Sequence, residues 1–184
     1  MNTQPDLDAE ELKFLAMQAS RQNLGDQALL YLKRAIQRAP ERGDLHYLMA
    51  AEHAQLGMLE RAMEEMERAL ALSPELHTAR LQLALLYLGA QRVDDARRAL
   101  QALQELAPDH ALHHFGLGLQ YLMQDRFAEC RAALEQGIAL NVENPALNTD
   151  MGKLLDALPA PDAGQAPPGG NVWLSAYRRD TGPD

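Results

Sequence analysis

The chain has 184 residues and a formal net charge of −9, and its 33 leucines and 30 alanines make up about a third of it. This composition favours helices and argues against an all-β fold. A single cysteine excludes both a disulfide framework and a four-cysteine zinc site, and the acidic balance argues against nucleic acid as the main partner.

The first eight residues form an acidic, polar N-terminal extension, whereas a secretory signal would be basic and then apolar. No apolar run approaches the roughly 18 residues that a membrane-spanning helix requires. We therefore expect a cytoplasmic protein without a membrane span.

Residues 9–142 repeat with a period of 34, which is seen in the prolines at 40, 74 and 108 and in the small residues Ala16, Ala50, Ala84 and Gly118. A period of this length indicates stacked units that cannot bury their apolar faces alone. Helical spacing of apolar residues predicts two helices in each unit. The first helices are expected at 9–22, 43–56, 77–90 and 111–124, and the second at 26–38, 60–72, 93–106 and 127–140.

Short turns are predicted between the two helices of each unit, at 24–26, 56–58, 88–91 and 124–126. The first three contain glycine, which we expect to end the first helix with a positive φ. The periodic prolines end the second helices, and the periodic small residues allow paired helices to approach closely where they cross.

Residues 143–158 are expected to form a capping helix, because Pro145 suits a first helical turn and an apolar stripe follows it. The stripe consists of Leu147, Met151, Leu154 and Leu155. After it, residues 159–170 are typical of a Pro/Gly linker, and residues 171–184 form a C-terminal aromatic segment.

The pattern resembles that of the tetratricopeptide repeat family, which has Leu, a small residue and an aromatic in its first helix. The third unit matches at Leu83, Ala84, Tyr87, Ala96, Leu100 and Pro108, and the fourth at Leu117, Gly118, Tyr121 and Leu134. The sequence departs from the pattern where Ala19 and His53 take the aromatic place and Gly137 replaces an alanine. The resemblance implies an all-α fold: a right-handed α-solenoid of four units (9–41, 42–75, 76–109 and 110–142), a capping helix and a flexible tail.

The resemblance also implies a concave face lined by the first helices, and hence a peptide-binding groove. By register, its residues are Lys13, Met17, Tyr47, Ala51, Leu81, Leu85, Phe115, Leu119 and Leu122. Because the set is mostly apolar, we expect an apolar peptide or helix as the occupant. Family members that grip a chaperone's C-terminal carboxylate carry Lys and Asn there, and only Lys13 fits. In the alternative interpretation, the register is shifted by one and these residues pack against neighbouring helices.

The aromatic segment offers one candidate occupant of the groove. Trp173, Leu174 and Tyr177 lie on one side of a short predicted helix, and large aromatics on a tether are typical anchors for a pocket. This tail folds back on its own chain, docks into a partner or a second copy of the chain, or binds nothing.

No catalytic motif is present in the sequence, and we expect no enzyme activity, no cofactor and no metal site. Gly116 and Gly118 lack the third glycine of a dinucleotide-binding motif and indicate close helix packing instead. The histidines at 110, 113 and 114 have no cysteine nearby, and Cys130 takes a small, buried place in the repeat.

The leading hypothesis is a non-catalytic adaptor or scaffold that binds a protein segment. The alternative is a cytoplasmic secretion-type chaperone for an apolar segment of a secreted protein, because residues 115–155 look similar to type III secretion translocator chaperones. A third class, an enzyme or the regulatory part of one, is disfavoured by the length of the chain.

Overall fold

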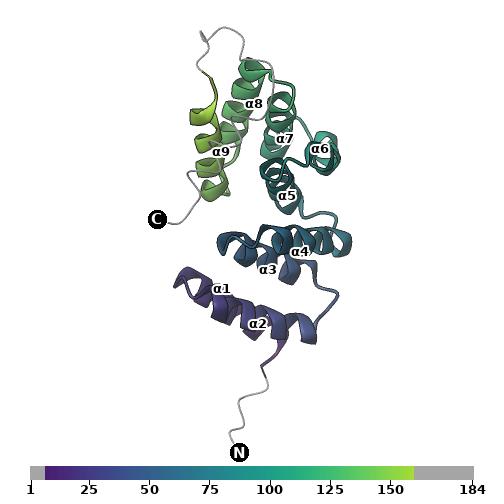
Figure 1. Ribbon diagram of the computed structural model, residues 1–184, viewed down its shortest axis with the longest axis vertical. Coiled ribbons are helices and arrows are strands. Elements are labelled where there is room, and N and C mark those ends of the chain that lie inside the picture. Colours follow the sequence, from purple (N-terminus) through teal and green to yellow (C-terminus); the bar gives the residue numbers. More distant parts are fainter. Residues whose placement is uncertain (1–6, 160–184) are drawn as a thin grey trace, which may run out of the picture. The chain divides into compact units, whose positions relative to one another are not determined.

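The computed structural model describes residues 7–159, and every regular element in this part of the chain is a helix (Figure 1). The chain divides into two compact units, with the boundary between residues 79 and 80. The expected all-α fold of helix-turn-helix repeats is confirmed. No helix of the described part is long and apolar enough to cross a membrane.

The first unit contains two helix pairs, α1 (Ala9–Arg21) with α2 (Gly25–Arg38) and α3 (Gly43–Gln55) with α4 (Leu59–Leu72). A capping box starts α1, in which the side chains of Asp8 and Glu11 each accept the other residue's backbone N–H at 2.9 Å. Within this unit α1 packs on α2, α2 on α3 and α3 on α4. Leu12, Ala35 and Leu45 are fully buried where α1, α2 and α3 meet.

The second unit contains most of α5 (His77–Gly89), together with α6 (Val93–Gln101), α7 (Ala111–Leu122), α8 (Phe127–Leu140) and α9 (Pro145–Ala157). One expected helix is shorter than predicted, because α6 ends at Gln101 and a 3-10 helix, η1 (Ala102–Glu105), continues the chain. The tighter turn carries the fully buried Leu103 against Gly116 of α7, where an added Cβ would lie 3.1 Å from the Leu103 Cβ. Such 3-10 turns are frequent at helix ends.

The turns inside the four helix pairs share one geometry. A residue with positive φ occurs at Asn23, Gly57, Gln91 and Asp125, so the 34-residue period extends to the backbone conformation. Glycine was predicted to supply this conformation in the first three turns; the prediction holds at Gly57 and is wrong for the first and third turns, where Asn23 and Gln91 take the position. Gly25 instead begins α2, and Gly89 ends α5. Asn and Asp tolerate the left-handed region better than most residues, which explains Asn23 and Asp125 but not Gln91.

In two of these turns, an arginine contacts residues on both sides of the turn. The guanidinium of Arg92 lies 4.5 Å from the centre of the Tyr87 ring, and that of Arg126 lies 4.4 Å from the Tyr121 ring. Both arginines also hydrogen-bond to an acid three residues later, Arg92 to Asp95 at 2.5 Å and Arg126 to Glu129 at 2.9 Å. These hydrogen bonds lower the pKa of both carboxyl groups.

The expected capping helix is present as α9. Pro145 occupies its first turn, and the Asn144 side chain accepts the backbone N–H of Leu147 at 3.1 Å. Leu147, Met151 and Leu154 are buried, whereas Leu155 is only half-buried. The helix packs on α8.

Candidate functional site

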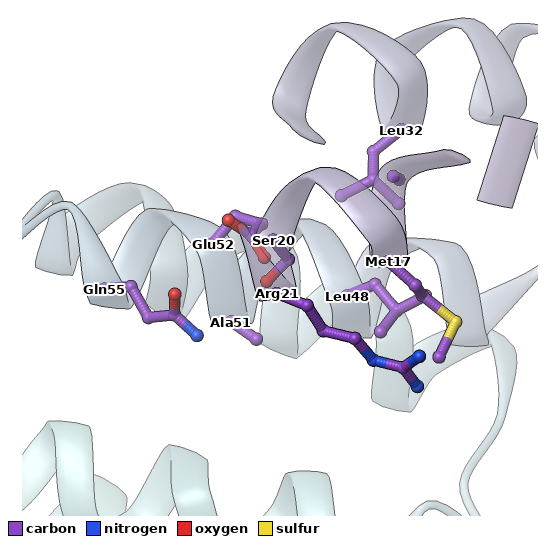
Figure 2. Close-up of a pocket in the computed structure, with 9 residues that line it drawn as sticks. Met17, Ser20, Arg21, Leu32, Leu48, Ala51, Glu52 and Gln55 are labelled. Carbon is purple, nitrogen blue, oxygen red and sulfur yellow. The ribbon is translucent and has the colours of Figure 1, made fainter. Parts of the chain in front are cut away.

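A pocket of about 220 Å³ lies between α1 and α3 in the first unit (Figure 2). Its α1 side comes from residues 16, 17, 20 and 21, which share one face because helical neighbours recur every three or four positions. Residues 48, 51, 52 and 55 have the same spacing on α3. The lining residues are Ala16, Met17, Ser20, Arg21, Leu32, Leu48, Ala51, Glu52 and Gln55.

The walls of the pocket are mostly apolar, and some of this surface is open. Met17 is 37% exposed, whereas Leu32, which also lines the pocket, is buried at 1%. Figure 2 shows the Arg21 side chain passing Leu48, with its guanidinium near the end of the Met17 side chain. An apolar hollow with a few polar groups is the usual form of a binding site.

Four charged side chains join α1 to the start of α3. Asp44 accepts hydrogen bonds from Lys13 and Arg42, both at 2.6 Å, and Arg42 also pairs with Glu10. The hydrogen bond from Arg42, helped by the one from Lys13, lowers the pKa of Asp44 to about 2. Lys13 therefore forms an ion pair with Asp44, and it does not line the pocket.

The structure brings together only two of the nine predicted groove residues, Met17 and Ala51. Tyr47 and Leu85 are half-buried and do not line this pocket. The expectation of solvent-facing side chains is wrong for the remaining apolar residues, because they lie in the packed interior with at most 5% exposure: Leu81, Phe115, Leu119 and Leu122.

Gly137 explains why the Phe115 ring is buried. A Cβ on Gly137 of α8 would lie 2.5 Å from two carbons of the Phe115 ring, so the absent side chain makes room for that ring. Gly118 similarly admits Leu134, since its Cβ would lie 2.6 Å from that side chain. Gly116 and Gly118 therefore allow close helix packing, as predicted. Phe115 packs against a neighbouring helix, as the alternative interpretation of the groove register expected.

The sequence-based prediction missed all four polar residues of the pocket, above all Glu52. Ser20, Glu52 and Gln55 lie within one helical turn of the predicted Met17 and Ala51, and this spacing was the available signal. Glu52 is only 5% exposed, although acidic residues on a repeat helix normally face solvent.

The weak candidates for chemistry have structural roles. His110 caps α7 by accepting the Leu112 N–H at 3.1 Å, and His114 contacts the Pro108 carbonyl at 2.7 Å. Within residues 7–159, no group of three or more His, Cys, Asp or Glu side chains could hold a metal ion. Cys130 is fully buried, as predicted, and burial raises the pKa of its thiol to about 12. The predicted tail anchors Trp173, Leu174 and Tyr177 lie outside the described residues.

Comparison with known proteins gives one family match, between residues 53–117 and the tetratricopeptide repeat model. No curated protein matches the chain in sequence. The expected resemblance of residues 115–155 to type III secretion translocator chaperones stays a prediction, because the family match ends at residue 117.

Several solved structures share the fold at low sequence identity. MamA from Desulfovibrio magneticus RS-1 is 20% identical with a TM-score of 0.60, over 94% of this chain and 92% of that one. TTC0263, a thermophilic tetratricopeptide repeat protein of Thermus thermophilus, is 20% identical with a TM-score of 0.59, over 94% and 98%. YrrB, described as a tetratricopeptide repeat protein with an unusual peptide-binding site, is 20% identical with a TM-score of 0.57, over 77% and 73%.

Proposed function

We propose that this tetratricopeptide repeat protein is a non-catalytic adaptor that binds a peptide segment of another protein in the pocket between α1 and α3. The observation that carries the proposal is the open apolar wall of that pocket, formed by Met17, Leu48 and Ala51. The peptide-binding site named for YrrB supports the class of ligand, since that protein shares the fold.

The size of the pocket favours a peptide side chain over a cofactor. Its volume of about 220 Å³ is below the roughly 300–1,000 Å³ that drug-sized ligands occupy. One or two side chains of an extended segment would fill it. Each large apolar side chain that is fully buried on binding contributes about 1.5–3 kcal/mol, so neighbouring contacts along α1 and α3 are needed for a stable complex.

The groove of this proposal is shorter than the one expected from the register. Leu81, Phe115, Leu119 and Leu122 are buried and leave no surface for a partner. The binding residues proposed from the original set are therefore Met17 and Ala51, extended by their neighbours Leu48 and Gln55.

Selection of a phage-displayed library of random nonapeptides on the purified full chain tests the proposal, with the affinities of enriched peptides measured by calorimetry. Ala51→Arg places a long charged side chain in the pocket, and we expect binding to weaken at least about tenfold, or about 1.4 kcal/mol. Ala71→Arg is the matched control, because Ala71 is exposed on α4 and does not line the pocket. Absence of enriched peptides, or equal affinities of the two variants, would refute the proposal.

A further inference from the structure

Glu52 is an acid in the wall of the α1–α3 pocket with no partner in the described structure. Its residue is 5% exposed, and its side chain forms no hydrogen bond or ion pair with any residue from 7 to 159. Figure 2 shows this side chain turned from α3 toward α1, near Ser20, which lines the same pocket.

Other partly buried acids of the first unit are paired. Asp44 accepts hydrogen bonds from Arg42 and Lys13 at 2.6 Å, and Glu65 lies 2.6 Å from Nδ1 of the buried His46. The Glu52 oxygens are not among the fully buried side-chain atoms that lack a partner, so the carboxylate reaches the solvent in the pocket and is accessible to a ligand. Glu52 is therefore an acid that is unpaired within residues 7–159 and opens on an apolar wall.

The other charged residue of the pocket does not fill this role. Arg21 is exposed on α1 and forms no ion pair with Glu52. Among the nine lining residues, Glu52 is the only acid, and it lies beside the apolar surfaces of Met17, Leu48 and Ala51.

We propose that the pocket recognises a Lys or Arg side chain of the bound peptide, whose cationic head pairs with the Glu52 carboxylate. The aliphatic stem of such a side chain packs on the apolar wall while its head reaches the acid, as amphipathic side chains do elsewhere. The inference rests on the proposed peptide binding and adds its specificity: the occupant is an apolar segment with a basic residue, not a purely apolar one.

The test compares the peptides that the full chain and its Glu52→Gln variant select from the same random nonapeptide library. We expect Lys or Arg to be enriched at one position with the wild-type chain and not with Glu52→Gln. Glu60→Gln is the matched control, because Glu60 is an exposed acid on α4 outside the pocket; it should keep the wild-type preference.

The best wild-type peptide is then synthesised with Lys and with norleucine, which keeps the stem and removes the ammonium group, at the enriched position. The Lys peptide should bind the wild-type chain about 30-fold more tightly than the norleucine peptide, and the two should bind Glu52→Gln equally. Enriched peptides without a basic residue, or equal binding of the pair by the wild-type chain, would overturn the inference and leave the proposed function intact. A library without any enriched peptide would overturn both.

Discussion

Replacing Glu52 with glutamine should stabilise the free protein, although the residue is only 5% exposed and the substitution changes a packed position. Most substitutions at buried sites destabilise. Glu52 differs because its carboxylate has no donor among the described residues and lies beside the apolar wall of the pocket, and the amide of glutamine has nearly the same size without the charge.

The magnitude follows from the missing partner. A buried polar group without a hydrogen bond costs about 1–3 kcal/mol, and a charged one costs more. The Glu52 oxygens keep contact with the solvent in the pocket, so only part of this cost applies, and we expect a gain of up to about 1 kcal/mol in the free energy of unfolding. For a chain of this length, that gain corresponds to an increase in Tm of up to about 4 °C.

Thermal unfolding followed by far-UV circular dichroism at neutral pH measures the effect, with Glu60→Gln as the control for removal of an exposed acid. The control should stay within about 0.5 kcal/mol of the wild-type chain. A Glu52→Gln variant less stable than wild type by about 1 kcal/mol or more would show that the carboxylate already has a stabilising partner, and the reasoning would be wrong.

Further predictions concern the packing of α8 and the ion pairs at the start of α3. Gly137→Ala should lower the stability by about 1–3 kcal/mol in urea denaturation, because its Cβ would lie 2.5 Å from the Phe115 ring. Gly152→Ala has no atom within 4 Å of its Cβ and should be neutral or stabilising by up to about 1 kcal/mol; equal losses would contradict the packing account. Since its ion pairs lower the pKa of Asp44 from 3.8 to about 2, their contribution is present above about pH 4 and is lost as the pH falls toward 2. An acid titration of Asp44→Asn should lack this loss, and identical profiles for both proteins would contradict the assignment.

The helix pairs could be predicted because their signals are local and repeated. Proline, small residues and helical spacing recur every 34 positions, and the structure begins and ends most helices within about two residues of the expected limits. The conformation of the turns was harder to predict, because the positive-φ place falls on Asn23, Gln91 and Asp125 while nearby glycines serve other purposes. Glycine alone is therefore an incomplete marker of the left-handed conformation.

The candidate site could be predicted only in part. Met17 and Ala51 follow from the register, but Phe115 does not, because its burial depends on a glycine in another helix. The departure of Gly137 from the usual alanine was a signal that something larger fills that space. Glu52 was missed for a different reason: its neighbours across the pocket come from α1, and the sequence of α3 contains no information about that distance.

Methionine-methyl NMR tests the central claim most directly, because Met17 lies in the pocket and Met58 does not, while the two are 37% and 39% exposed. The full chain, labelled at its methionine methyl groups, is titrated with the best library-selected peptide. We predict a saturable shift of the Met17 resonance that Ala51→Arg weakens, with the Met58 resonance unchanged. An unmoved Met17 signal at peptide concentrations that saturate binding in calorimetry would contradict the claim and place the peptide elsewhere on the chain.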